Sequence, residues 1–166
     1  MPARTVLRYP HPSLKRPAAA VDFDNLDDLV GIARDLTDTM RANEGCVGLA
    51  APQIDRIVRM IVVDVSEHPR AGASNGLLVL VNPRIVAASG SDVAREGCLS
   101  IPDFTANVRR ATEVVIEAVT PQGEDVRIAS EGFEARCLLH ELDHLDGILF
   151  LDRVNSLKDD VFRRKR

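Results

Sequence analysis

The chain has 166 residues, a mass of 18.2 kDa and a formal net charge of −4. Hydrophobic residues make up 45% and charged residues 28%, which is ordinary for a soluble globular protein. The negative net charge disfavours a general DNA-binding protein. The sequence has no apolar run long enough for a signal peptide or a membrane span, so no membrane partner is expected. Three cysteines, an odd number, favour reduced thiols and a cytoplasmic location.

The first predicted element is a helix over Leu26–Met40. Apolar side chains recur there at helical spacing, Asp24 is placed to cap the N-terminus, and the helix should end before Gly45. The next predicted elements are strands, separated by segments rich in glycine, proline and small polar residues. The predicted strands are Ile57–Asp64, Leu77–Asn82, Glu113–Val119 and Asp125–Ala129.

A second helix is predicted near the end of the chain, where one stripe of side chains keeps helical spacing. The stripe consists of Phe133, Cys137, His140, Glu141 and His144. Gly147 is a plausible stop, because glycine readily takes the left-handed conformation after a helix. Strands that cluster between two helices argue against a parallel sheet. We predict a single α+β domain over residues 1–166, with mostly antiparallel, partly open β-sheets wrapped around this second helix, an N-terminal helix and a short C-terminal helix.

The predicted second helix carries the pattern HExxH, from His140 to His144. Residues four apart lie on one helix face, about 6 Å apart along the axis, so the two imidazoles can share one metal ion. Glu141 is placed to reach a water on that metal without being a ligand. A polar surface helix can also contain HExxH by chance. However, the stripe points inward, and buried imidazoles without partners would cost about 1–3 kcal/mol each. A metallohydrolase is therefore the first interpretation.

The third metal ligand is less clear from the residues alone. Phe150 stands where some HExxH proteases carry a third histidine, and no Glu or His follows His144. Upstream, Cys137 lies about 10 Å along the helix from His144 and is better read as a core residue. Cys98 follows the flexible Gly97, and a kink there could direct its thiol towards the helix. The remaining candidates are Cys46, Asp146, Asp152, Asp159 and Asp160.

Three segments in this order resemble the motifs of the peptide deformylase family: Cys46–Gln53, Glu96–Ser100 and His140–His144. The similarity extends from about Val6 to Leu157. The resemblance implies a metal bound by Cys98, His140 and His144, with water in the fourth position. It also implies that Glu141 is the acid/base, that Gln53 and the Leu99 N–H stabilise the oxyanion, and that Val47 and the Gly48 backbone bind the substrate.

The resemblance further implies removal of the N-terminal formyl group from formyl-methionyl nascent peptides, with attack by metal-bound hydroxide and release of formate. One thiolate and two imidazoles suit a catalytic site with an open position. The family favours Fe(II), and Zn(II), Ni(II) or Co(II) suit the same donors. The alternatives are a metallohydrolase of another small amide and a non-catalytic relative with a structural metal. Glu141 and Gln53 favour catalysis, because a structural site needs neither.

Three features depart from the family pattern or stand outside it. Cys46 replaces the first glycine of the first motif, and its thiol could oxidise or compete as a ligand. Arg136 stands where the family usually has an apolar side chain. We interpret Arg136 as a side chain whose aliphatic part packs against the protein while its guanidinium reaches water. The alternative interpretation is that Arg136 changes the side-chain preference for the substrate. The basic tail Arg163–Arg166 suggests a transient ribosome contact, although a solvated end is the simpler interpretation.

Overall fold

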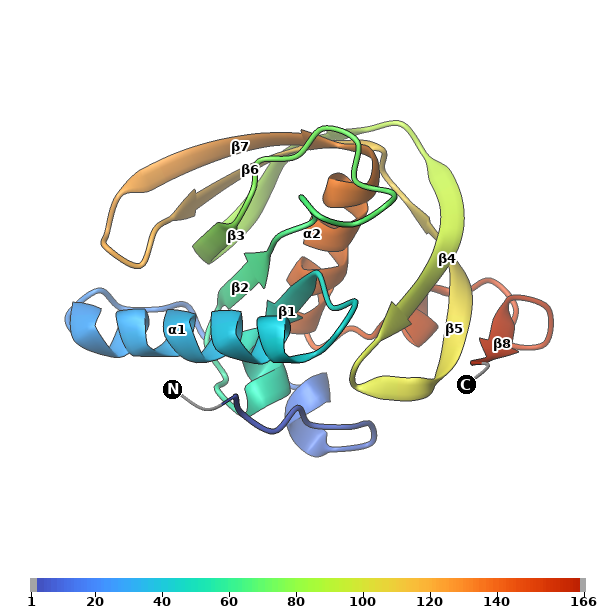
Figure 1. Cartoon of the computed structure of the whole chain (residues 1–166), viewed down its shortest axis with the longest axis horizontal. Coiled ribbons are helices and arrows are strands. Elements are labelled where there is room, and N and C mark those ends of the chain that lie inside the picture. Colours follow the sequence, from blue (N-terminus) through green and yellow to red (C-terminus); the bar gives the residue numbers. More distant parts are fainter. Residues whose placement is uncertain (1–2, 165–166) are drawn as a thin grey trace.

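The structure is a computed structural model that describes residues 3–164 (Figure 1). The helices are α1 (Leu26–Ala42) and α2 (Gly132–Leu145), with single 3₁₀ turns η1 (Pro12–Lys15), η2 (Ala51–Ile54) and η3 (Phe150–Arg153). The strands are β1 (Gly48–Ala50), β2 (Met60–Val63), β3 (Leu78–Ser89), β4 (Asp92–Cys98), β5 (Ile101–Arg110), β6 (Glu113–Val119), β7 (Asp125–Glu131) and β8 (Val161–Arg163).

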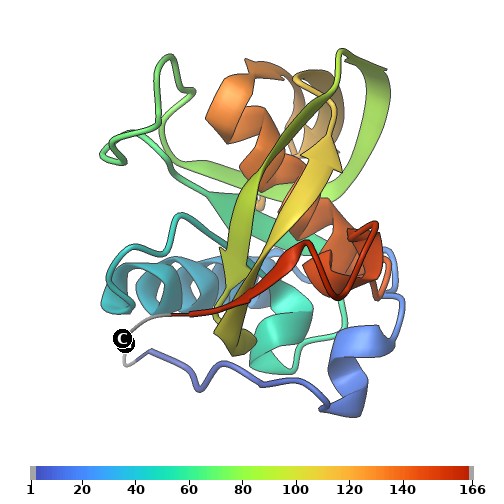
Figure 2. The same ribbon diagram turned by 90° about the vertical axis from the view of Figure 1, so that its right-hand side faces the viewer.

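Two antiparallel sheets lie on different sides of α2, which runs through the middle of the molecule (Figure 1). The first has the order β1-β2-β3-β6-β7, and the second has the order β4-β5-β8. Strand β1 lies at an edge of the first sheet, and β8 lies beside β5 in the second (Figure 2). This arrangement confirms the predicted α+β fold, with antiparallel open sheets around the HExxH helix.

The apolar stripe of α2 packs on the larger sheet and forms the main core. Leu138 and Leu145 are fully buried there, beside Ile61 and Ile116 of the sheet. Burying one such side chain contributes about 1.5–3 kcal/mol. A second core joins α1 to β1 and β2 through Leu29, Ile32, Leu36 and Met40 of the helix. The contacts of the main core fix α2 against the larger sheet. His140 and His144 lie on the other side of α2, away from this core.

The predicted elements agree with the structure in type and differ in length. Strand β6 has the predicted bounds, β2 is shorter than predicted, and β3 and β7 extend further. Helix α1 begins where expected, but its N-cap is Asn25, whose side chain accepts a hydrogen bond from the Asp28 N–H at 3.2 Å. The prediction of Asp24 as the cap is therefore wrong. None of the helices within residues 3–164 has the length and apolar character of a membrane span.

The β4–β5 hairpin was not among the predicted strands; the sequence indicated only a kink at Gly97. The ladder does break there: Gly97 pairs with Thr105, but the next residue, Cys98, pairs with Ile101. The residues between these partners on β5, including Pro102, bulge out of the ladder. A proline is tolerated at such a point because the ladder requires no N–H from it.

The predicted short C-terminal helix is wrong. Within the described part of the tail, the chain makes only the 3₁₀ turn η3 and then strand β8, which pairs with β5 from Phe104 to Ala106. Val161 and Phe162 are β-branched and aromatic residues, which favour a strand. The Phe162 ring also lies 3.7 Å beneath the guanidinium of Arg95 on β4. The tail is therefore held against the second sheet.

Candidate metal centre

Helix α2 presents two imidazoles from successive turns towards β4. His140 and His144 are both buried, and their ring centroids lie 5.2 Å apart in an edge-on arrangement. Phe150 stacks on His140 with ring centroids 6.1 Å apart, so it contributes packing at the centre. Gly147, with φ of 75°, ends the helix one turn later, as the sequence predicts. The helix therefore fixes the relative position of the two rings.

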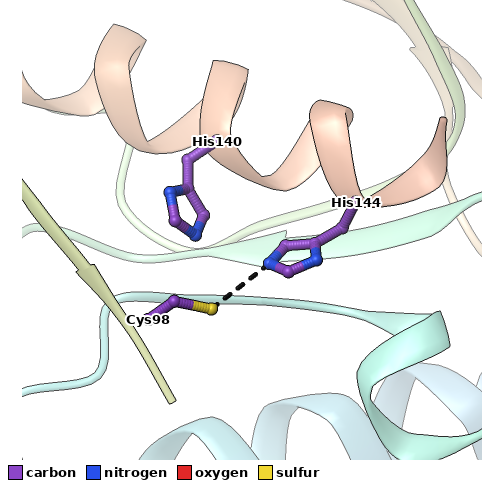
Figure 3. A group of neighbouring side chains, drawn as sticks. All are labelled: Cys98, His140 and His144. Atoms are coloured by element: carbon purple, nitrogen blue, oxygen red, sulfur yellow. Dashed lines mark hydrogen bonds between the residues drawn. The ribbon is translucent and has the colours of Figure 1, made fainter. Parts of the chain in front are cut away.

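The thiol of Cys98 reaches these imidazoles from the end of β4 (Figure 3). Its Sγ lies 3.4 Å from Nε2 of His144, and one ligand atom from each of the three residues falls within 4.8 Å of the others. The break in the ladder after Gly97 aims Cys98 at the helix. Among the other sequence candidates, Asp146 pairs with Arg59 at 3.0 Å, and Asp152 pairs with Lys15.

The donor set fits a metal ion. A thiol and two imidazoles from one strand and one helix are typical ligands of Zn(II) and related divalent ions. Burial lowers the pKa of His144 well below its usual value. Burial also acts to lower the pKa of His140, but its hydrogen bonds to Cys98 and Glu96 outweigh burial and raise that pKa well above its usual value. Metal binding displaces such a proton from a ligand. The three buried residues could hold one metal ion.

Glu141 lies beside the triad with an unused carboxylate oxygen. Its side chain is buried, and Oε1 has no hydrogen-bond partner among the residues that the structure describes. Burial raises the pKa of this carboxyl to about 7. Gly48 of β1 passes so close that a Cβ at this position would lie 2.7 Å from Glu141 Oε2. Only glycine leaves the Glu141 carboxylate in its present place.

A cavity of about 260 Å³ opens beside the triad, and the other predicted site residues line it. They are Val47, Gly48, Gln53 and Leu99. Gln53 is buried in η2, where its Oε1 accepts the Ala50 N–H at 3.0 Å. Its Nε2 lies 3.1 Å from Ser100 Oγ and 3.5 Å from Cys98 Sγ, so the donor end of the amide faces the centre. A larger groove of about 440 Å³ is lined by none of these residues.

Glu96 is the residue whose role the sequence interpretation missed. It is buried, and its Oε1 lies 2.9 Å from Nδ1 of His140. Arg110 donates to both of its oxygens, at 2.6 and 2.9 Å. Burial opposes its charge, but the hydrogen bonds to His140 and Arg110 lower the pKa of Glu96 to about 2. The missed signal is its spacing: side chains two apart on a strand share a face, so Glu96 points the same way as Cys98.

The interpretation of Arg136 as a solvated side chain is wrong. Arg136 is buried, and its Nη1 donates to Glu96 Oε2 at 2.7 Å and to the Val108 carbonyl at 2.8 Å. Its Nη2 donates to the Asp92 carbonyl at 2.9 Å. The Arg136 guanidinium is therefore held inside the protein by β4 and β5, which supply one carboxylate and two carbonyl groups as hydrogen-bond acceptors.

The two other cysteines also line the cavity but lie outside the ligand cluster. The Cys46 thiol donates to the Gly48 carbonyl at 3.2 Å, and burial raises its pKa to about 12. Burial also raises the pKa of Cys137, which packs in the main core as predicted. Both thiols therefore ionise less readily than a free cysteine, which makes them poorer nucleophiles and less prone to oxidation.

The chain was compared with known proteins. The model of the polypeptide deformylase family matches residues 3–160. A peptide deformylase of Syntrophobacter fumaroxidans is 42% identical over 161 residues, covering 96% of this chain and 91% of that protein. One of Thermomicrobium roseum is 43% identical over 157 residues, covering 94% and 88%. A solved class I type b peptide deformylase of Acinetobacter baumannii has a TM-score of 0.87 and 38% identity, covering 93% of this chain and 100% of that one. The chain belongs to the polypeptide deformylase family.

Proposed function

We propose that the protein hydrolyses the formyl group from the N-terminus of formyl-methionyl peptides of newly made proteins and releases formate. The observation that carries this proposal is the buried cluster of Cys98, His140 and His144, with a carboxylate oxygen of Glu141 beside it that has no hydrogen-bond partner within residues 3–164. A structural metal site needs no free carboxylate next to its ligands. The family to which the chain belongs supports the same activity.

Cys98, His140 and His144 would hold one divalent metal ion in this proposal. When bound, such an ion lowers the pKa of water and polarises a carbonyl oxygen. Fe(II) is the ion that the family resemblance favours, and Zn(II), Ni(II) and Co(II) suit the same donors. Glu96 orients His140: its carboxylate faces Nδ1, so Nε2 is the atom of this ring that would bind a metal ion.

Glu141 moves the protons of the reaction at its Oε1. It takes a proton from the attacking water as the new C–O bond forms at the formyl carbon. It then delivers this proton to the amine nitrogen as the C–N bond breaks, so formate and a free amino terminus leave. General acid–base help of this kind is worth about 10²–10⁴-fold in rate.

Two donors face the oxygen that becomes negative in the transition state. We assign these roles to Gln53 Nε2, which already points at Cys98, and to the backbone N–H of Leu99 in the turn after Cys98. Each donor of this type is worth about 10²–10³-fold. Val47 and Gly48 would bind the peptide backbone, because β1 is an edge strand that lines the cavity.

We propose that residues 1–166 form one catalytic domain that acts in the cytoplasm on emerging chains. The ribosome contact through Arg163–Arg166 stays a prediction, and Lys165 and Arg166 lie outside the described residues. Strand β8 is part of the second sheet, so deleting the tail would also disturb the fold. The ribosome contact is therefore tested by neutralising the tail charges and not by deletion. Ribosome co-sedimentation that is unchanged when these four side chains become glutamine contradicts the contact.

The activity is tested by formate release from formyl-Met-Ala-Ser with protein loaded anaerobically with Fe(II), or with Ni(II). Glu141→Gln should keep one metal ion per chain and lose about 10²–10⁴-fold in kcat. Cys98→Ser should lose the metal itself. The two variants separate chemistry from metal binding. Absence of formate with metal-replete wild-type protein overturns the proposed function.

A further inference from the structure

The cavity beside the triad carries an unusual group of arginines at its mouth. Arg70, Arg95 and Arg164 all line it, and all three are exposed. They come from the loop after β2, from β4 and from the residue after β8. This concentration of positive charge occurs in a chain whose net charge is −4. We refer to these three residues as the arginine rim.

Neutral neighbours hold the arginine rim in place. Arg70 lies over the Phe133 ring at 4.8 Å, and Arg95 lies over the Phe162 ring at 3.7 Å. Arg95 also donates to Asn107 and Thr105, which carry no charge. The Arg164 guanidinium packs over Gly97, where there is no side chain to displace it. Within residues 3–164, no ion pair joins any rim arginine to a carboxylate, so no described carboxylate neutralises a rim guanidinium by direct contact.

The buried charges beneath the rim are balanced. The two buried arginines, Arg110 and Arg136, pair with the carboxylates of Glu96 and Asp143. The positive charge at the mouth of the cavity therefore comes from the rim itself.

Two further carboxylates line the same cavity. Glu141 lies at the inner end beside the triad, and Glu44 is exposed. Neither forms an ion pair with a rim arginine in the part of the chain that the structure describes. The outer part of the cavity thus favours an anion.

We propose that the arginine rim binds a carboxylate of the peptide substrate, beyond the formylated residue, and makes the protein prefer acidic peptides. The proposal deepens the proposed function and rests on it. Guanidinium groups bind carboxylates with two parallel hydrogen bonds. The rim belongs to the cavity that contains the triad, so a peptide bound at the triad passes it. The carboxylate comes from an Asp or Glu side chain or from the C-terminus of a short peptide.

The test compares peptides that differ only in this charge. Formyl-Met-Asp-Ser-amide and formyl-Met-Asn-Ser-amide are nearly isosteric, as are the corresponding peptides with Glu or Gln in third position. A free or amidated C-terminus on formyl-Met-Ala-Ser tests the other source of the carboxylate. We expect kcat/KM to favour the charged member by about three- to fivefold at low ionic strength, mainly through KM. High salt should reduce this ratio, because the rim is exposed.

Variants then locate the effect. In the triple variant R70Q/R95Q/R164Q the ratio of charged to neutral peptide should fall to about one. The matched control R127Q removes an exposed arginine of β7 that does not line the cavity, and it should keep the wild-type ratio. The ratio is internal to each variant, so a general loss of activity does not obscure it.

Three results overturn the inference. Equal rates for charged and neutral peptides in the wild type do so, as does a preference that survives in the triple variant. A rim that binds RNA instead predicts equal inhibition of both peptides by a short RNA, without any preference for the acidic one. Failure of the proposed function itself looks different, because then no peptide of either kind releases formate.

Discussion

Replacing Glu96 by glutamine should weaken both the fold and the metal centre. The Glu96 carboxylate serves three donors at once: His140 Nδ1 at 2.9 Å, Arg110 at 2.6 and 2.9 Å, and Arg136 at 2.7 Å. The amide of glutamine keeps one acceptor oxygen and turns an NH₂ group towards the other donors. The variant therefore removes a buried charge and also opposes its neighbours.

The structure sets the size of both effects. Removing one partner of a buried ion pair costs about 3–5 kcal/mol. The low end applies here, because Arg110 keeps Asp143 at 2.8 Å and Arg136 keeps two carbonyls. A loss of about 3 kcal/mol lowers the Tm of a chain this long by about 6–12 °C. Disturbing the group that orients a metal-binding histidine typically lowers metal affinity by about 10–100-fold.

Thermal unfolding and competition with a metal chelator measure these two quantities. Glu117→Gln is the matched control, because Glu117 is half-buried at the sheet surface and pairs there with the exposed Arg84 and Arg127. It should cost no more than about 1 kcal/mol and leave metal affinity unchanged. If Glu96→Gln keeps both the wild-type Tm and the wild-type metal affinity, the role assigned to Glu96 is wrong.

Three further variants probe other contacts. Gly48→Ala should displace the Glu141 carboxylate and lower kcat at least about tenfold without loss of fold, measured by formate release and circular dichroism. Arg136→Met should cost about 2 kcal/mol in chemical denaturation, because two carbonyls and a carboxylate lose a donor. Asp152→Asn should cost at most about 1 kcal/mol near pH 7. Burial opposes the charge of Asp152, but the hydrogen bond from Lys15 outweighs burial and lowers its pKa. The stability difference is therefore full above the unfolded pKa and is lost as the pH falls through the lower folded pKa.

Gly48→Ala has a matched control variant, and the other two predictions each have a result that would contradict them. Gly31→Ala in α1, where an added Cβ meets nothing within 4 Å, should stabilise by up to about 1 kcal/mol and leave kcat unchanged. An Arg136→Met protein as stable as the wild type argues against the buried ion pair. For Asp152→Asn, a stability difference that persists well below pH 4 shows that the charge is not its cause.

Helical geometry explains why half of the candidate site could be predicted from residues alone. His140 and His144 share a face because four residues make about one helical turn, a relation that involves no distant part of the chain. The inward stripe and Gly147 placed the helix and its end for the same reason. By contrast, the residues alone left the third ligand open, and only the family resemblance indicated Cys98. A thiol on another element reaches the histidines only through the pairing of β4 with β5.

The errors also have non-local causes. Residues 161–163 form a strand because β5 offers an unpaired edge, and a three-residue strand has no stability without that partner. Arg136 is buried because Glu96, Val108 and Asp92 converge on it from two strands. Local pattern gives no sign of such partners.

The sequence by itself determined the helices, most strands of the larger sheet and the HExxH face, because these depend on periodicities of a few residues. The tertiary structure decided how Glu96 and Arg110 support His140, and which charges gather at the cavity mouth. Ion pairs and close approaches depend on distances between segments far apart in the chain. Such distances exist only once the two sheets have closed around α2.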